Sequence, residues 1–382
     1  MSTVFEAGYR FRPVADDDID GLMEMARLSG AGFSSLRPDP EFLTAYIRQS
    51  VDSFNAPQAQ ANRKHLLVLE APEGDKIVGC AAVKTNIGRA YPFINFRYMR
   101  EDGAPAFDPA QARFLDPSSN FDGATEIGSL FLHPDHRQSG VGRYLAKVRY
   151  LMIACAPHQF AKTLVSELRG VTDDAASATF YNHVYRDRLG ISFVEADARY
   201  SFADEAMLAP VLPDGPLEIR KLPDAARAVM AEPNETGIGA MKLLKREGFR
   251  FANTIDLFDA GPIMSARRDE IETVRRARKA SVVAGHDLPC LKSPRPFDGR
   301  NTAEGLVAAG GLTDFRAVLT RFELDGNEVR LHPRSIRALG IDEGAEVTIS
   351  PQGQTIRTST PRETRFHCTA PRLKSRRALA HV

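Results

Sequence analysis

The stretch from Thr125 to Met152, TEIGSLFLHPDHRQSGVGRYLAKVRYLM, constrains the fold of this chain more than any other. It begins with the alternating apolar run EIGSLFL, which is typical of a β-strand that buries one face. The loop HPDHR and the turn QSGVG follow, and apolar residues then recur near helical spacing from Tyr144 onward. The pattern predicts a strand, a glycine-containing turn and a helix in direct succession.

A strand that enters a helix through such a turn is a phosphate-binding device. Glycine lets the backbone approach an anion closely, and the first N–H groups of the helix have no intrahelical acceptor. The turn fits the spacing Arg-x-x-Gly-x-Gly, with Arg137, Gly140 and Gly142. It therefore predicts a coenzyme phosphate site, and a purely structural tight turn is the alternative.

Composition narrows the class of protein. The chain has 382 residues, which favours one large domain and a smaller one, and its net charge of +1 gives no reason to expect a nucleic acid or an anionic membrane as partner. The N-terminal residues lack the apolar core of a signal peptide, and no apolar run is long enough to span a bilayer. Scattered cysteines, with neither metal-ligand nor disulfide-framework spacing, favour a reducing, cytoplasmic location. The four are Cys80, Cys155, Cys290 and Cys368.

Secondary-structure patterns alternate along the first 262 residues. Strands are expected at 9–14, 65–71, 76–87, 91–102 and 163–170, helices at 15–30 and 40–54, and a surface excursion at 101–124. Two segments, 177–197 and 239–261, each have a helix-then-strand pattern, and the sequence leaves open which of them closes the coenzyme site.

A change of character follows residue 262. We expect a charged, solvated helix at 265–280, strands at 316–326, 327–333 and 345–351, a small helix at 335–340 and a basic, disordered tail. The predicted domains are therefore 1–262 as a core, 263–360 as a small β-rich domain and 361–382 as the tail.

Several segments resemble a known family in the order in which they occur. They are FRPV, LSGAGFSSL, INFR, EIGSLFLHPDHR, SELRG, VTDD, PNET, LLKREGF and IDLFDAGP. The chain is similar to the arginine N-succinyltransferases (arginine/ornithine succinyltransferases), which are GNAT-like acyltransferases. The turn at Arg137 resembles the GNAT loop that binds the pyrophosphate of acyl-CoA.

This resemblance implies an α+β fold, in which a GNAT-like mixed sheet is flanked by helices and followed by a small C-terminal β-rich domain. It implies transfer of succinyl from succinyl-CoA, as co-substrate rather than permanently bound cofactor, to the α-amino group of arginine or ornithine in arginine catabolism. A homo- or hetero-oligomer is expected. A GNAT acetyltransferase of another amine and a non-catalytic acyl-CoA-binding paralogue or partner subunit are the alternatives.

Seven residues are expected at the coenzyme. Their backbone groups, or a guanidinium, would face the pantetheine arm, the thioester or the pyrophosphate. They are Leu130, Phe131, Leu132, Arg137, Gly140, Val141 and Gly142. Leu130 matches the family position for succinyl-CoA contact, and a role in the core is its alternative. No metal site is expected, because His133 and His136 have no Cys/His cluster around them.

The acid/base group is where the sequence departs from the family. Family members have a proton-donating His directly before the Pro of PNET, whereas Glu232 stands there in this chain. A desolvated carboxylate can take that role because burial raises its pKa. Glu126 and Glu167 compete as general base or as ligands of the amine or guanidinium, and a salt bridge with Arg169 is their alternative. Arg97 and Arg169 are candidates for binding a carboxylate, with structural roles as the alternative.

Overall fold

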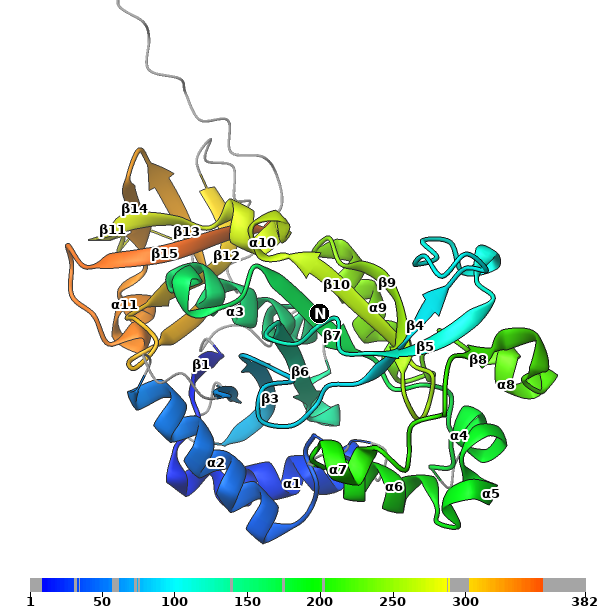
Figure 1. Cartoon of the computed structure of the whole chain (residues 1–382). Coiled ribbons are helices and arrows are strands. Elements are labelled where there is room, and N and C mark those ends of the chain that lie inside the picture. The colour runs from blue at the N-terminus through cyan, green and yellow to red at the C-terminus, as the bar shows by residue number, and fades with distance from the viewer. Residues whose placement is uncertain are drawn as a thin grey trace, which may run out of the picture.

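The structure is a computed structural model that describes residues 9–352 apart from 31–32, 34, 57–61, 72–73, 75, 138–139, 174–175, 201–202, 287 and 289–301. The predicted tail at 361–382 lies outside the described residues. One continuous sheet contains all of the described strands, and its order is β12-β15-β11-β14-β13-β1-β2-β3-β6-β7-β10-β9-β4-β5-β8. Figure 1 shows its two parts, a broad central sheet and a C-terminal barrel.

The central sheet carries ten of these strands. In chain order they are β1 (Arg10–Pro13), β2 (Lys64–Glu70), β3 (Ile77–Lys84), β4 (Asn95–Met99), β5 (Phe114–Ser118), β6 (Thr125–Leu132), β7 (Thr163–Glu167), β8 (Leu217–Glu218), β9 (Arg250–Asp256) and β10 (Pro262–Arg267). The pair β6–β7 is parallel and the other described pairs in this part are antiparallel. The predicted strand pair at 65–71 and 76–87 is confirmed by β2 and β3.

Helices cover both faces of this sheet. On one face, α1 (Ile19–Ser29) and α2 (Pro40–Asn55) bury an apolar stripe against β2 and β3, and on the other face α3 (Val141–Cys155) and α9 (Gly237–Arg246) pack together. The side chain of Asp39 accepts hydrogen bonds from the first N–H groups of α2, which fixes where that helix begins. The two predicted N-terminal helices are confirmed, and Gly30 ends the first of them as expected.

Short helices surround the far end of the sheet, beside β4 and β5. They are α4 (Thr179–Val184), α5 (Arg186–Leu189), α6 (Phe193–Tyr200), α7 (Glu205–Leu208) and α8 (Asp224–Ala228). Their apolar side chains form a second core with those of β4, β5 and β9. Figure 1 shows these helices in green, below and to the right of the central sheet.

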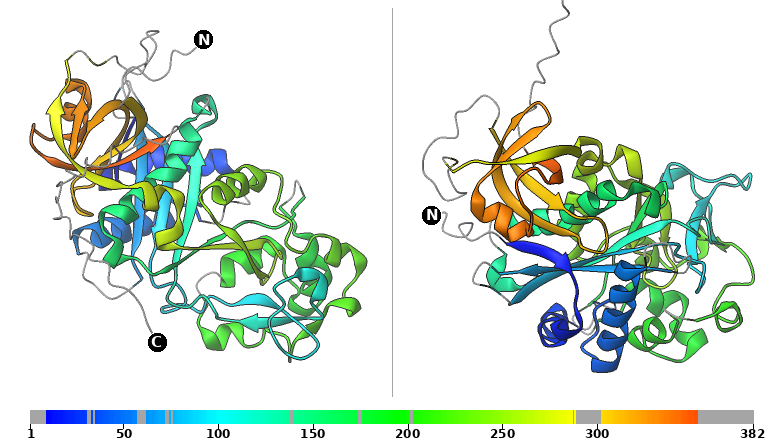
Figure 2. Two further views of the ribbon diagram at one scale, coloured as in Figure 1. Left: turned by 90° about the horizontal axis from the view of Figure 1, so that it is seen from above. Right: turned by 90° about the vertical axis from the view of Figure 1, so that its left-hand side faces the viewer.

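The C-terminal part is a small barrel. Its strands are β11 (Arg278–Ala284), β12 (Thr302–Ala309), β13 (Arg316–Asp325), β14 (Glu328–Leu331) and β15 (Glu346–Gln352), with the helix α11 at Pro333–Leu339. The order β12-β15-β11-β14-β13 closes through the additional pairing of β12 with β13. Figure 2 shows this barrel beside α3 and β1. The strands predicted at 316–326, 327–333 and 345–351 and the helix at 335–340 are confirmed.

Three segments differ from their predicted structure. In place of a long helix at 265–280, β10 continues to Arg267, α10 spans only Glu272–Arg276, and β11 begins at Arg278. The many charges suggested a solvated helix, but the ends of the segment pair as sheet strands with β7 and β15. The boundary predicted at residue 262 therefore falls at the start of β10, and we place the start of the barrel at β11.

The strand expected at the end of 177–197 is also wrong, because α6 occupies it. Gly190 ends α5 with φ of 67°, and Ser192 then caps α6. The Ser192 hydroxyl accepts the Glu195 N–H, and the Glu195 carboxylate accepts the Ser192 N–H. This reciprocal Ser-x-x-Glu capping box was the overlooked helix signal. The helix-then-strand pair is α9 with β9. The excursion at 101–124 contains a paired strand, β5, which the sequence reading missed.

Candidate active site

A β-bulge in β6 opens the centre of the sheet. Cys80 of β3 pairs with Phe131 and Ala82 pairs with Gly128, so Ser129 and Leu130 together face the single residue between them on β3. Ser129 has φ of 47°, in the left-handed region that non-glycine residues rarely adopt. Its buried hydroxyl lies 3.2 Å from the Tyr46 hydroxyl of α2. The bulge therefore turns Ser129 toward α2 and takes the Ser129–Leu130 backbone out of regular pairing.

β6 separates from its parallel neighbour β7 beside this bulge. In the described residues, the ladder between the two strands consists of Thr125 with Leu164 and Glu126 with Val165. The Ser166 hydroxyl donates to the Ile127 carbonyl at 3.1 Å, just beyond the last pair. From Ile127 to Leu132, the described backbone of β6 does not pair with β7. Such an edge can hydrogen-bond an extended ligand arm lying between the strands.

The turn that follows β6 leads into α3 as predicted. Gly140 is the N-cap of α3 and has φ of 104°, which explains why glycine is required there. Arg137 is exposed beside this turn, where its Nε donates to the Leu132 carbonyl at 3.1 Å and its guanidinium lies 5.5 Å from the centre of the Phe131 ring. The first N–H groups of α3 and the Arg137 side chain thus lie at the end of β6, an arrangement suited to a diphosphate.

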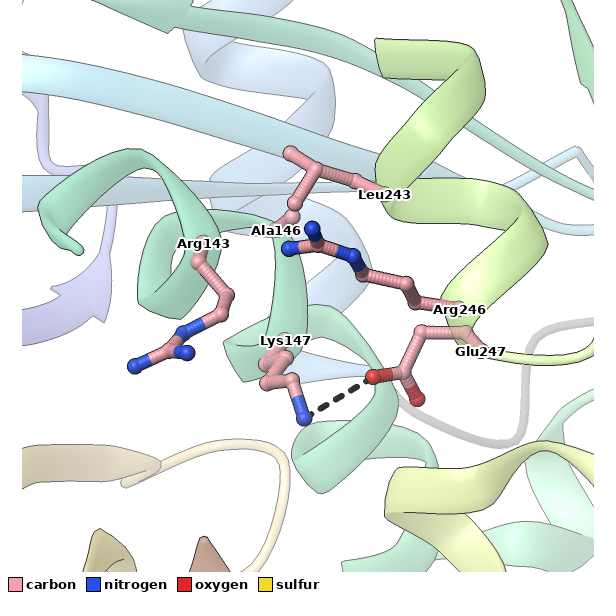
Figure 3. A pocket seen from close by; sticks show the side chains of 6 residues that line it. All are labelled: Arg143, Ala146, Lys147, Leu243, Arg246 and Glu247. Carbon is pink, nitrogen blue, oxygen red and sulfur yellow. Dashed lines mark ion pairs between the residues drawn. The ribbon is translucent and has the colours of Figure 1, made fainter. Parts of the chain in front are cut away.

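A basic pocket lies between α3 and α9, and Figure 3 shows its lining. It has a volume of about 130 Å³ and is lined by Arg143, Ala146, Lys147, Leu243, Arg246 and Glu247. Lys147 pairs with the buried Glu247 at 3.0 Å, and Glu247 also accepts the Thr273 N–H at 2.9 Å. Neither Arg143 nor Lys147 was singled out from the sequence. Two basic residues one helical turn apart, directly after the glycine turn, were the signal for an anion-binding surface.

Carboxylates gather on the opposite face of the sheet, where α1 and α2 pack. Glu126 lies directly across from Lys84 in the β3–β6 ladder, and the Lys84 ammonium is 3.0 Å from both of its carboxylate oxygens. The bidentate contact holds Glu126 at the last position where β6 and β7 are still paired.

Glu167 lies two residues beyond Val165, the partner of Glu126, so it is on the same face but past the point where the strands separate. Glu167 is the last residue of β7; the residue as a whole is exposed, but its carboxyl group is surrounded by protein. The surrounding protein desolvates the carboxyl group, and Asp256 is the next largest influence; together they raise the pKa of Glu167 well above its ordinary value. A carboxylate with a raised pKa is a stronger base than a carboxylate with the ordinary value.

Arg169 is held in a buried network. Its guanidinium pairs with Asp197 at 3.2 Å and with Asp259 at 3.1 Å, and it lies 5.4 Å from the centre of the Phe193 ring. Burial raises the pKa of Asp259 to about 7, an effect to which Asp256 adds and which Arg169 opposes. These contacts give Arg169 a structural role beside its predicted role in binding a carboxylate. Arg97, the other predicted carboxylate ligand, is half-buried on β4 opposite Thr254 of β9.

The segment that contains Glu232 docks at the end of β7. Pro233 forms an isolated bridge with Gly170, and the Asn234 N–H donates to the Arg169 carbonyl at 2.9 Å. Glu232 itself is exposed. The structure thus brings the PNET segment, Glu167 and the strand separation to one region, although Glu232 and Glu167 are far apart in the chain.

A bulged strand that separates from its parallel neighbour and leads through a glycine turn into a helix is the arrangement of a GNAT-type acyltransferase. Residues 9–273 match the family described as "Arginine N-succinyltransferase beta subunit", and residues 297–351 match the C-terminal domain of the same subunit. The chain belongs to the arginine N-succinyltransferase family. The predicted family, fold class and enzyme class are confirmed.

Individual relatives cover nearly the whole chain. It is 31% identical to the arginine N-succinyltransferase of Yersinia pestis (strain Pestoides F) over 346 residues, which are 89% of this chain and 97% of that protein. The Photorhabdus laumondii arginine N-succinyltransferase is 28% identical over 351 residues, with the same coverage. The solved structure of arginine/ornithine succinyltransferase subunit AI from Pseudomonas aeruginosa superposes with a TM-score of 0.76 at 27% identity, and the match covers 91% of this chain and 100% of that one.

No helix in the described part of the chain combines the length and the apolar character that crossing a membrane requires.

Proposed function

We propose that this protein transfers the succinyl group of succinyl-CoA to the α-amino group of arginine. The observation that carries the proposal is the position of Glu167, a carboxylate with a raised pKa beside the opening between β6 and β7. The names of the relatives, arginine N-succinyltransferase, support the choice of acyl donor and amine.

The coenzyme binds in extended form along β6. Its pyrophosphate accepts hydrogen bonds from the first N–H groups of α3 at Val141 and Gly142, and Arg137 adds a positive charge. The pantetheine arm runs between β6 and β7 against the backbone of Leu130 to Leu132. The thioester carbonyl then lies at the bulge, where the Leu130 N–H stabilises the negative charge that develops on its oxygen.

The amine reaches the thioester from the face that carries the carboxylates. Glu167 accepts a proton from the ammonium group of arginine, and the free amine attacks the thioester carbon. A C–N bond forms, the tetrahedral intermediate collapses and the C–S bond breaks. CoA leaves as a thiolate and takes up the proton that the attacking nitrogen loses, so the products are the amide and the free thiol. Glu126 and Glu232 lie on the approach path and bind the cationic parts of the amine, so orientation adds to the rate.

A thiol-release assay tests this function. Purified protein mixed with succinyl-CoA and arginine is expected to release free CoA, and mass spectrometry of the product is expected to show an amide at the α-amino group. Ornithine, lysine and agmatine are compared with arginine, and acetyl-CoA is compared with succinyl-CoA. If no basic amino acid supports thiol release from succinyl-CoA, the proposed function is wrong.

We also propose that the chain acts in the cytoplasm as a subunit of an oligomer. Cys80 and Cys155 are free thiols, which suits a reducing compartment. The family description names a beta subunit, and the Pseudomonas aeruginosa relative is called subunit AI. Light scattering at assay concentration tests the assembly, and an active monomer would contradict it.

A further inference from the structure

Two lysines stand directly opposite each other in the central sheet. Lys64 of β2 pairs in register with Lys84 of β3, and Lys84 pairs in turn with Glu126 of β6. Like charges placed directly opposite on neighbouring strands destabilise a sheet. Lys64, Lys84 and Glu126 therefore form a row across three adjacent strands, with two ammonium groups and one carboxylate in register.

Tyr46 of α2 connects this row to the bulge. The Lys64 ammonium lies 5.0 Å from the centre of the Tyr46 ring, and the Tyr46 hydroxyl lies 3.2 Å from the Ser129 hydroxyl. Lys84 is close enough to Tyr46 to act on its ionisation. The lysines, Tyr46 and Ser129 thus share the α2 face, next to the backbone that receives the thioester carbonyl.

Gly128 leaves room between the bulge and the row. It follows Glu126 by two residues, which is about 7 Å along a strand, and it is half-buried. Among the described residues, a Cβ atom built on Gly128 would meet one atom within 4 Å, a Glu126 carboxylate oxygen at 3.2 Å. A short acyl chain whose carbonyl lies at Leu130 can therefore extend across Gly128 toward the lysines.

We propose that Lys64 binds the distal carboxylate of the acyl group, that Lys84 adds a second positive charge there, and that the enzyme therefore selects a dicarboxylic acyl-CoA. The inference rests on the proposed acyl transfer and adds the residue that recognises the far end of the acyl group. A carboxylate at this position meets the charge of both lysines and offsets their mutual repulsion.

The ionisation of the two lysines agrees with this role. Burial, followed by the neighbouring Lys84, lowers the pKa of Lys64 to about 8. Burial alone would lower the pKa of Lys84 as well, but the influence of Glu126 outweighs it and raises that pKa to about 12. A bound carboxylate would raise the pKa of Lys64 again, so binding of a dicarboxylic acyl-CoA is expected to be linked to proton uptake near pH 8.

The amino-acid substrate is a second source of a carboxylate. An α-carboxylate at Lys64 would make the lysine a determinant of the amine rather than of the acyl group. Butyryl-CoA has the chain length of succinyl-CoA without its carboxylate, and argininamide is arginine without an ionised carboxylate. Comparing each pair separates the two sources.

The experiment measures binding of succinyl-CoA, butyryl-CoA and free CoA by calorimetry to the wild type and to Lys64→Met, Lys64→Gln and Lys64→Arg. We expect the wild type to favour succinyl-CoA over butyryl-CoA, both neutral variants to lose at least about tenfold of that preference, and Lys64→Arg to keep most of it. Free CoA is expected to bind all four proteins alike, which also shows that the variants fold. Lys76→Met is the matched control, because Lys76 is an exposed lysine directly before β3 that pairs with Glu24 on α1.

An unchanged preference in both neutral variants overturns the proposal. It is also overturned if they change the arginine-to-argininamide ratio of kcat/KM and leave the acyl preference intact, since Lys64 then binds the amine. The binding measurements require no turnover, so a wild type that fails to acylate arginine refutes the proposed function while the acyl preference still decides the role of Lys64.

Discussion

Glu167 differs from the other two candidate carboxylates in how it is held. Glu126 is fixed by Lys84 and Glu232 lies in the loop before Pro233, whereas Glu167 lies at the strand opening with its pKa raised by desolvation and then by Asp256. We expect Glu167→Gln to lower kcat by about a hundredfold or more and to leave binding of CoA intact, because general bases contribute about 10²- to 10⁴-fold. Steady-state kinetics and calorimetry measure the two effects.

The pH profile provides the control for this assignment. Glu167 works as a carboxylate, so kcat/KM is expected to fall as the pH drops through its raised pKa, above the ordinary value of 4.5. The variants Glu126→Gln and Glu232→Gln should show the same fall of kcat/KM at low pH. If Glu232→Gln abolishes turnover and Glu167→Gln retains it, Glu232 and not Glu167 is the general base.

His65, which packs against Phe54 and Phe160, makes the free energy of unfolding depend on pH. It is fully buried on β2, with ring centres 4.9 Å from Phe54 and 5.6 Å from Phe160. Burial, with Arg63 as the next cause, lowers the pKa of His65 from 6.5 to about 4. As the pH falls, the imidazole of His65 is therefore protonated in the unfolded chain before it is protonated in the folded protein. The contribution of His65 to the free energy of unfolding is complete above pH 6.5 and is lost as the pH falls toward 4. The loss over this window is about 3 kcal/mol.

Urea unfolding at pH 7 and pH 5 measures this contribution. We expect His65→Leu to lose less free energy of unfolding between the two pH values than the wild type, by about 2 kcal/mol. His158→Leu is the matched control, because His158 is exposed and is expected to leave the pH dependence unchanged. Equal pH dependence in the wild type and in His65→Leu would remove His65 as the cause.

At the level of elements, the turn between β6 and α3 is the part of the site most open to test. A Cβ atom at Gly142 would lie 3.7 Å from a Leu132 methyl group, so alanine is tolerated, but the larger valine would crowd the N–H groups of the first turn. We expect Gly142→Val to raise KM for acyl-CoA at least about tenfold with a small change in kcat. Gly239→Val in α9 is the control, because no atom of the part of the chain that the structure describes lies within 4 Å of a Cβ built there. An unchanged KM in Gly142→Val would remove the turn from the coenzyme site.

This element was predictable because its signals are local. The alternation of 125–132, the glycines at 140 and 142 and the helical spacing after them lie within one short stretch. The bulge at Ser129 was not predictable, because it arises from a register shift against β3, about fifty positions earlier in the chain. The same holds for the raised pKa of Glu167, which depends on Asp256 of β9, a strand that the sheet order places next to β10, the neighbour of β7. Sequence patterns report periodicity within one strand, whereas the site is made by the order in which strands pair.

The whole molecule joins its two parts through a shared core. β1 pairs with β2 on one side and with β13 of the barrel on the other, with Phe11 opposite both Leu69 and Ala317. Phe11, Leu145 of α3 and Phe315 of the barrel belong to one buried cluster. The Tyr144 hydroxyl also donates to Glu304 of β12 at 2.9 Å. The barrel thus supports α3, whose first turn is the proposed coenzyme site.

Removing the barrel is therefore expected to unfold the core rather than to release an independent domain. A chain that ends at Arg276 would expose Phe11, the barrel-facing side of α3 and one edge of β1. Phe315→Ala is the milder test, since Phe315 is fully buried and loss of such a ring costs about 3–5 kcal/mol. We expect this variant to unfold in one transition at lower urea, with far-UV circular dichroism and loss of CoA binding coinciding. Two separate transitions, or a truncated chain that still binds CoA, would show that the barrel and the core fold independently.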